Sequence, residues 1–171
     1  MRLWGTMELP VQINVRQETM PYWFDGNNLI GQSAAVARLD SKTRKSFLGL
    51  LSEYAALRGG SFLVFFDGDD SARILPPKGV RVRYSAPWST DDAILRAAEG
   101  ARSPREIVVV TNDNGLAGRC RSAGARTISW RQFTDTMAKS RPRPGRTRTT
   151  EAKVDVADWS RFFGLDPDDL K

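Results

Sequence analysis

The sequence predicts an α/β fold of three layers, α/β/α, with a mostly parallel sheet between two layers of helices. Two strand-sized apolar runs, FLVFF at 62–66 and IVVV at 107–110, contain no polar residue. Such runs are typical of strands that are buried on both faces, as in a parallel sheet covered by helices. Segments with helical periodicity alternate with these runs, and 171 residues suit one compact domain.

Five strands are expected, at residues 22–25, 62–67, 80–84, 107–111 and 126–129. Helices are expected between and after them, at residues 41–58, 91–101, 115–123 and 130–137. The helix over 41–58 carries its apolar residues on one face, and the pair Gly59-Gly60 favours a helix end there. Repetition of strand, helix and strand predicts that successive parallel strands are connected across the faces of the sheet.

The chain has a single cysteine, Cys120, and no histidine. This composition excludes Ser-His-Asp and Cys-His nucleophile pairs, an imidazole general base, and zinc sites built from histidine or several cysteines. Catalysis would depend on carboxylates, Lys or Arg, hydroxyls, backbone dipoles or a hard metal bound by oxygen. The apolar runs are far shorter than the ~20 residues of a membrane span, and the first twenty residues lack a secretory core. We therefore expect a cytoplasmic protein that does not bind membranes.

The net charge of +6 is unevenly distributed and divides the chain into four parts. An N-terminal extension at 1–19 precedes the predicted domain at 20–138. Residues 139–150 contain five basic residues, two prolines and no acid, which is typical of an extended flexible linker. Residues 151–171 are acidic overall, and their apolar residues recur at helical spacing, which predicts a short amphipathic helix.

Acidic residues follow the predicted strands at four places. Asp25, Asp67 and Asp113 come at or just after strand ends, and Asp91 and Asp92 open the helix after the third strand. Because the carboxyl ends of parallel strands share one edge of a sheet, these side chains are expected to converge. Clustered carboxylates stay ionised when a cation neutralises them, and oxygen ligands favour Mg²⁺ or Mn²⁺. Such a site supports metal-assisted attack of water on a phosphodiester.

Each acidic position has a simpler interpretation when taken alone. A single Asp at a strand end is more often a turn former or a helix cap than a ligand. Ser89 and Asp92 also fit the S-x-x-D capping pattern, and adjacent helical residues such as Asp91 and Asp92 point ~100° apart. Four such positions on one edge nevertheless favour a site.

Four segments in order resemble the YacP-like branch of the NYN domains, in the PIN-like nuclease superfamily. They are DGNNLIG at 25–31, VFFDG at 64–68, STDDAIL at 89–95 and VVTNDNG at 109–115. The resemblance extends over about residues 22–137. It implies a PIN-like α/β/α fold and metal-dependent cleavage of RNA. By position, it implies that Asp25, Asp91 and Asp113 are the metal ligands, with Asp92 as the neighbour of Asp91.

The resemblance also implies supporting roles for other residues. Asn28 would support the first ligand, and Asp67 would be a second-strand acid that does not itself bind the metal. The chain has Asn27 where a Tyr is common in this branch, so a stacking role at that position is not carried over. It has Asn112 where Ser is frequent, which keeps a polar group there.

Basic and aromatic residues near the predicted acidic edge are candidates for contacts with the RNA backbone and bases. They are Arg44, Lys45, Arg81, Arg83, Trp88 and Arg119. Arg81 and Arg83 alternate on a strand and therefore share a face, and Trp88 could stack on a base. Each could equally be part of a solvated or packed surface. The basic linker could bind RNA or a ribosomal surface through its charge alone.

These observations lead to the hypothesis of a Mg²⁺- or Mn²⁺-dependent endoribonuclease that acts on single-stranded or flexible RNA. One alternative is a non-catalytic RNA- or ribosome-binding module with an inert acidic edge. Another is a phosphatase in which Asp67 is the nucleophile and Asp69 the acid, as VFFDGDD suggests. In such phosphatases the nucleophile strand normally comes first, whereas here the strand ending at Asp25 precedes it.

Overall fold

The structure is a computed structural model that describes residues 21–31, 40–58, 62–72 and 74–139. The predicted extension at 1–19, nearly all of the linker and the whole tail at 151–171 lie outside these residues. Five parallel strands form one sheet in the order β3-β2-β1-β4-β5. Their bounds are β1 Tyr22–Asp25, β2 Phe62–Phe66, β3 Val80–Tyr84, β4 Val108–Val110 and β5 Arg126–Ile128.

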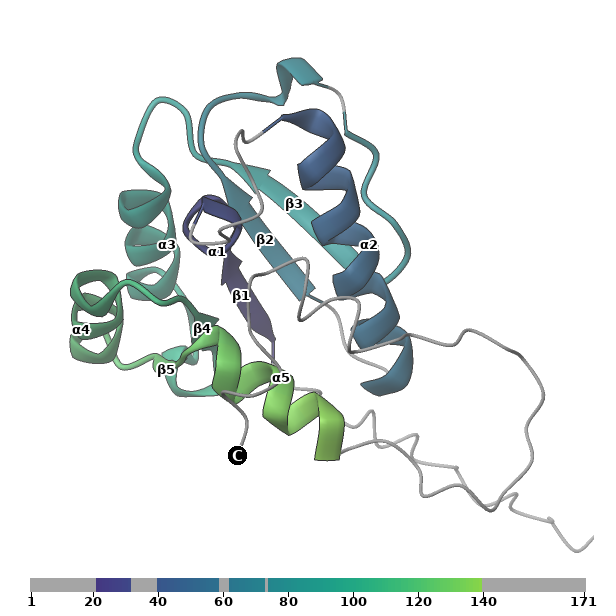
Figure 1. Cartoon of the computed structure of the whole chain (residues 1–171). Helices are drawn as coiled ribbons and strands as arrows, with labels where there is room; N and C mark the ends of the chain where they lie inside the picture. Colours follow the sequence, from purple (N-terminus) through teal and green to yellow (C-terminus); the bar gives the residue numbers. More distant parts are fainter. Residues whose placement is uncertain (1–20, 32–39, 59–61, 73, 140–171) are drawn as a thin grey trace, which may run out of the picture.

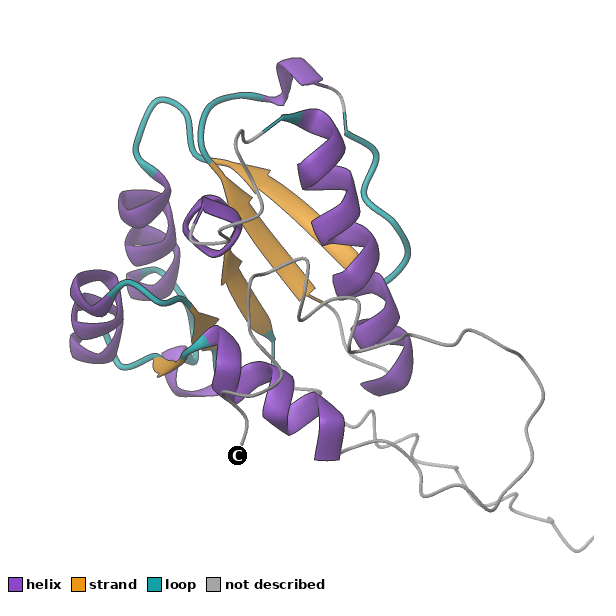
Figure 2. Cartoon of the chain, in the orientation of Figure 1, coloured by secondary structure: helices purple, strands orange, loops and turns teal. Residues whose placement is uncertain are grey.

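Five α-helices and two short 3₁₀ helices accompany these strands in the described ranges. The α-helices are α1 Gly26–Gly31, α2 Ser41–Arg58, α3 Thr90–Glu99, α4 Asn114–Ser122 and α5 Trp130–Lys139. The 3₁₀ helices are η1 Asp70–Ala72 and η2 Pro104–Glu106. None of the described helices combines the length and apolarity needed to cross a membrane. As Figures 1 and 2 show, helices flank the sheet on both sides, so the predicted α/β/α fold is confirmed.

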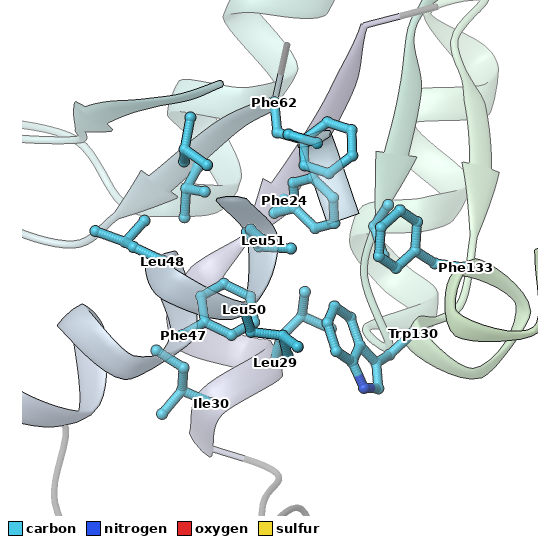
Figure 3. Close-up of a cluster of buried hydrophobic side chains, with 14 of the residues drawn as sticks. Phe24, Leu29, Ile30, Phe47, Leu48, Leu50, Leu51, Phe62, Trp130 and Phe133 are labelled. Atoms are coloured by element: carbon cyan, nitrogen blue, oxygen red, sulfur yellow. The ribbon is translucent and has the colours of Figure 1, made fainter. Parts of the chain in front are cut away.

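Side chains alternate between the two faces along each strand, and two hydrophobic clusters form, one on each face of the sheet. The larger cluster joins Phe24, Phe62 and Val64 of the sheet to α1, α2 and α5. Its rings pack edge to face, with the Phe24 and Phe133 centroids 5.0 Å apart (Figure 3). The smaller cluster joins Phe65 and Val109 to α3 and α4. The central strands β2, β1 and β4 are thus covered on both faces, which explains their continuous apolar sequences.

The predicted elements agree with the structure to within two residues at each end, but helix α1 was not predicted. Its sequence, GNNLIG, is short and rich in Gly and Asn, which are weak helix formers. Burial of Leu29 and Ile30 stabilises it in the fold. Gly26 permits the close contact with β2, because a Cβ there would lie 2.5 Å from Cε1 of Phe66. The helix therefore starts directly after Asp25.

Candidate active site

The strand order changes direction between β1 and β4. From β1 the chain proceeds to β2 and β3 on one side, whereas β4 and β5 lie on the other side. In open parallel sheets, ligands bind at the carboxyl ends of the strands beside such a reversal. Asp25 ends β1, and Thr111 and Asp113 directly follow β4. The topology therefore brings these three residues to the position where this fold class forms its sites.

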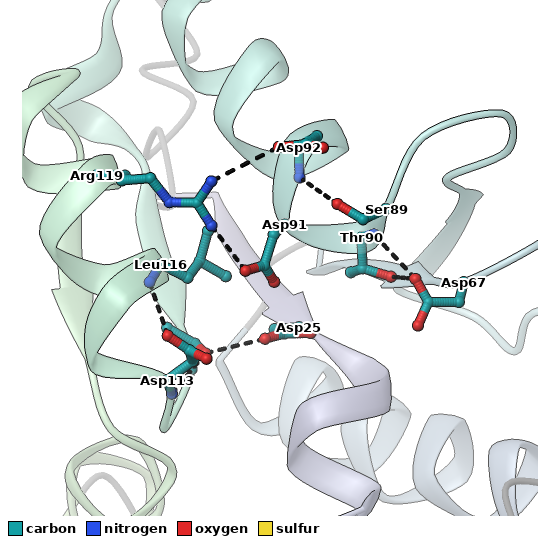
Figure 4. A network of polar contacts seen from close by, with 10 residues as sticks. Asp25, Asp67, Ser89, Thr90, Asp91, Asp92, Asp113, Leu116 and Arg119 are labelled. Atoms are coloured by element: carbon teal, nitrogen blue, oxygen red, sulfur yellow. Dashed lines mark hydrogen bonds and ion pairs between the residues drawn. The ribbon is translucent and has the colours of Figure 1, made fainter.

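Asp25 is the most buried carboxylate of this edge, with 2% of the residue exposed. Its Oδ2 atom accepts a hydrogen bond of 3.0 Å from the hydroxyl of Thr111. Burial raises the pKa of Asp25 to about 6, and the nearby charges of Asp91 and Asp67 add to this effect against the hydrogen bond from Thr111. Figure 4 shows Asp25, Asp91 and Asp113 pointing toward a common space. The fold thus places these acids at one edge of the sheet, and their role as metal ligands stays a prediction.

Thr111 links two of the acids and was not singled out in the sequence. The pairing of Phe24 with Val110 places the next residue of each strand, Asp25 and Thr111, side by side. The Thr111 hydroxyl donates to Asp25 and accepts a hydrogen bond of 3.0 Å from the backbone N–H of Asp113. Asp113 in turn caps α4, because its Oδ1 accepts from the N–H of Leu116 at 2.8 Å. The position of Asp113 is therefore defined from two sides.

Asp91 and Asp92 lie in the first turn of α3, where both interact with one arginine. Arg119 of α4 forms an ion pair with Asp91 at 2.7 Å and lies 3.6 Å from Asp92 (Figure 4). Burial raises the pKa of Asp91; Arg119 opposes this rise, whereas the charge of Asp113 adds to it. The hydroxyl of Ser89 accepts from the N–H of Asp92 at 3.1 Å, as the capping pattern predicted. Arg119, predicted to bind RNA, is thus bound to acidic side chains of this edge.

Asp67 lies at the surface after β2 and connects three segments through its hydrogen bonds. It accepts from Asn27 Nδ2 at 2.6 Å, from the backbone and hydroxyl of Thr90, and from the hydroxyl of Ser85 at 3.5 Å. Partial burial acts to raise the pKa of Asp67, but these hydrogen bonds outweigh it and hold the pKa below its usual value. An ionised Asp67 that is already bonded on both oxygens suits the supporting role that the resemblance implied.

Asn28 and Asn112 connect the site to the rest of the fold. Oδ1 of Asn28, in α1, accepts from the backbone N–H of Asn112 at 3.3 Å. Oδ1 of Asn112 accepts from the N–H of Trp130, the first residue of α5, at 3.0 Å. The loop after β4 is therefore bonded to a helix on each side, which holds Thr111 and Asp113 in place.

The acidic edge has the donor chemistry that a hard divalent cation requires. Among the ion pairs of the described residues, those at this edge involve Arg119 with Asp91 and Asp92, and none involves Asp25. Oδ1 of Asn27 is a buried oxygen that has no hydrogen-bond partner among the described residues. Within the described ranges no three acidic or cysteine side chains converge as a preformed metal site. Mg²⁺, however, commonly binds through one or two carboxylates and keeps several waters. Asp25, Asp91 and Asp113 supply carboxylates of this kind at one edge of the sheet.

The predicted RNA-binding residues fall into two groups. Arg81, Arg83, Trp88 and Lys45 are exposed. Arg44 instead packs its guanidinium 4.9 Å from the centre of the Phe66 ring, and Arg119 is paired as described above. The exposed group is thus accessible to a ligand, although Trp88 also contacts Arg96, whereas Arg44 is only partly exposed and Arg119 is paired with acids.

Thr111→Val is expected to lower the free energy of unfolding by about 1–3 kcal/mol. Valine keeps the shape of the side chain, but it removes the hydroxyl donor to the buried Asp25, which keeps its backbone bond from Asn28, and leaves the N–H of Asp113 without this acceptor. Denaturation in urea with EDTA present measures the change. Thr111→Ser is the matched control, because it keeps the hydroxyl; equal stability of the two variants would contradict the proposed role of the hydroxyl.

Comparison with known proteins identifies the family of this chain. The YacP-like NYN domain matches residues 23–158. Two crystal structures of Rae1 (YacP) from Bacillus subtilis, one of a mutant, each have a TM-score of 0.55 with this chain. Their sequence identities are 21% and 20%, and the matches cover 70% of this chain and 76% and 74% of theirs.

At this identity the likeness to Rae1 is one of fold, and no curated protein matches the sequence. The family match covers most of the chain and all four acidic positions after the strands. The chain therefore belongs to the YacP-like NYN domain family, a branch of the PIN-like nucleases.

Proposed function

We propose that this protein is a Mg²⁺- or Mn²⁺-dependent endoribonuclease that hydrolyses phosphodiester bonds in single-stranded or flexible RNA. The observation that carries the proposal is the buried Asp25 at the reversal of the strand order. Its pKa is raised to about 6, the charge of Asp91 adds to this rise, and Asp113 lies beside both at the same edge (Figure 4). A buried carboxylate beside other carboxylates is unfavourable without a cation, and this unfavourable charge favours metal binding.

Each residue of the acidic edge has a role in this proposal. Asp25, Asp91 and Asp113 hold the metal, and Thr111 sets the distance between Asp25 and Asp113. Asp67 positions the start of α3, and hence Asp91, through its bonds to Thr90. When bound, the divalent ion polarises the phosphoryl oxygen and promotes ionisation of the attacking water. Exposed basic residues bind the flanking phosphates. Arg81 and Arg83, on the edge strand β3, are two of them.

Product analysis tests the reaction. The purified chain is incubated with a single-stranded RNA in Mg²⁺ or Mn²⁺, with EDTA in a parallel sample. Attack by water leaves no 2′,3′-cyclic phosphate and does not need the 2′-hydroxyl, unlike attack by the neighbouring ribose oxygen. We expect cleavage that EDTA abolishes, that yields no cyclic phosphate, and that persists in a 2′-O-methyl substrate. Cleavage that requires the 2′-hydroxyl would refute this mechanism.

Arg119→Gln is expected to tighten Mn²⁺ binding severalfold. The guanidinium competes with the metal for the oxygens of Asp91 and holds down the basicity of that carboxylate. Both side chains are partly exposed, at 45% for Arg119 and 35% for Asp91, so loss of the pair should change the free energy of unfolding by less than about 1 kcal/mol. Isothermal titration calorimetry with Mn²⁺ measures the affinity, and Arg131→Gln on α5 is the control. Weaker Mn²⁺ binding would instead indicate that Arg119 positions Asp91 for the metal.

The pairing of Arg119 with Asp91 and Asp92 supports one second candidate, a non-catalytic RNA-binding module. In that case the arginine would be the permanent counter-ion of α3 and the acidic edge would be inert. Titration separates the two candidates: the nuclease binds Mn²⁺ saturably, whereas the module binds RNA in a salt-sensitive manner and does not bind the metal.

A further inference from the structure

A small pocket lies beside the acidic edge, between the end of β3 and the outer side of α3. Its lining includes Arg83, Ser85, Trp88 and Arg96, and its volume is about 230 Å³. Ala93 and Ala97, the small residues of α3, complete the wall on the helix side. The pocket therefore combines two arginines, an indole ring and a hydroxyl around a space of limited size.

The pocket lies where α3 passes from the central strands toward β3. Helix α3 packs on β1 and β2, and within the described residues β3 pairs with β2 and no other strand. On β3, Val82 and Tyr84 pack against the cluster on the opposite face, so Arg81 and Arg83 project on the α3 side. Arg83 thus lies between β3 and α3, on the wall of the pocket.

Trp88 has the exposure and support expected of a stacking platform. The residue is 51% exposed, which is unusual for so large an apolar side chain. The guanidinium of Arg96 lies 5.0 Å from the centre of its ring, in a cation–π contact that holds the indole in position. The ring is therefore restrained from one side while half of the residue remains open to a ligand.

We propose that this pocket binds one unpaired nucleotide of the RNA, with its base on Trp88 and an adjacent phosphate between Arg83 and Arg96. Aromatic rings and guanidinium planes are the groups on which proteins stack unpaired bases, and arginine binds phosphate in a bidentate manner. The volume is below the roughly 300–1,000 Å³ of pockets that enclose a drug-sized ligand, so it suits a single base. The inference rests on the proposed function for the identity of the RNA as substrate.

The pocket is connected to the acidic edge through shared residues. Ser85 is 1% exposed, borders the pocket, and donates to Asp67. Helix α3 carries Asp91 on the side facing Asp25, and Ala93 and Arg96 on the side facing the pocket. A nucleotide bound there would flank the phosphate at the acidic edge. The pocket would then select RNA whose base is free to leave a helix, which would account for a preference for unpaired substrates.

Binding measurements without cleavage test the pocket separately from catalysis. Fluorescence anisotropy in EDTA follows a labelled single-stranded RNA of about ten nucleotides, with a duplex of the same sequence in parallel. We expect Trp88→Ala to weaken single-strand binding at least about fivefold and Trp88→Phe to retain most of it, since the phenyl ring still stacks. Arg96→Gln should weaken binding and reduce the slope of affinity against salt by about one phosphate contact. Duplex binding should be unchanged by Trp88→Ala.

Arg105→Gln is the matched control, because Arg105 is exposed in η2, before β4 and thus at the opposite edge of the sheet. Wild-type affinity in both Trp88→Ala and Arg96→Gln would overturn the pocket, even if the protein cleaves RNA. Weakened binding in these variants would support the pocket, even if no cleavage is found. Competition by AMP or UMP as strong as that by the oligonucleotide would overturn the proposal in favour of a free mononucleotide site.

Discussion

Asp25→Asn is expected to abolish metal-dependent RNA cleavage, with a loss of at least about a hundredfold in kcat. The substitution removes the charge of the central buried carboxylate, and a bound metal ion contributes several kcal/mol to stabilisation of the transition state. The amide oxygen of Asn can still accept from Thr111, so the local structure should persist. Cleavage rates in Mn²⁺ and circular dichroism spectra measure the two effects.

Two further variants make this result interpretable. Asp113→Asn keeps a good cap residue on α4 but loses the charge, so it should also lose activity while α4 remains formed. Asp135→Asn, in the exposed part of α5, is the matched control and should cleave at the wild-type rate. Retained cleavage in Asp25→Asn or Asp113→Asn would contradict the assignment of these residues as metal ligands.

Asp25→Asn is also expected to stabilise the metal-free protein at neutral pH, by up to about 3 kcal/mol. The pKa of Asp25 is raised from 3.8 to about 6 in the folded state, so ionisation of this residue above pH 6 destabilises the fold. The wild-type protein should therefore gain stability as the pH falls from about 7 toward 4, and Asp91, whose pKa is also raised, adds a change of the same sign.

Urea denaturation in EDTA across this pH range measures the effect. Asp25→Asn should be more stable than the wild type at pH 7.5, and most of the difference should be lost by about pH 4, where Asp25 of the folded wild type is protonated and uncharged. Adding Mn²⁺ should raise the stability of the wild type at pH 7.5 and leave the variant nearly unchanged. A constant difference between the two proteins at all pH values would show that burial of the charge is not the cause.

The strands and the acidic edge could be predicted because they follow from patterns that the fold class constrains. A continuous apolar run such as FLVFF has few alternatives to a doubly covered strand, and the ends of parallel strands share an edge whatever their order. This reasoning placed Asp25, Asp67 and Asp113 at one edge without knowledge of the neighbours of each strand. The roles of Asp25 and Asp113 as metal ligands, and of Asp67 as a supporting acid, remain predictions.

The residues that position the acids could not be predicted, because they depend on register and on helix entry. Thr111 contacts Asp25 only because β1 and β4 pair with Phe24 beside Val110. Thr90 bonds to Asp67 only because α3 begins at Thr90. No periodic pattern in the sequence indicates that this threonine is buried. The partners of Arg119 and Arg44 likewise depend on tertiary structure, since an arginine in a helix is equally compatible with a solvated, a paired and a packed position.

The position of β3 at the end of the sheet has a consequence for self-association. An edge strand presents unpaired backbone N–H and C=O groups that can bind the edge of another molecule, and charged side chains are one means of preventing this. Arg81 and Arg83 supply two positive charges on this strand of five residues. Double replacement by neutral residues would therefore do more than weaken contacts with phosphate: it would remove the electrostatic barrier between two copies of the chain, with dimers or aggregates as the expected product. Variants that test RNA contacts on β3 are better made one arginine at a time.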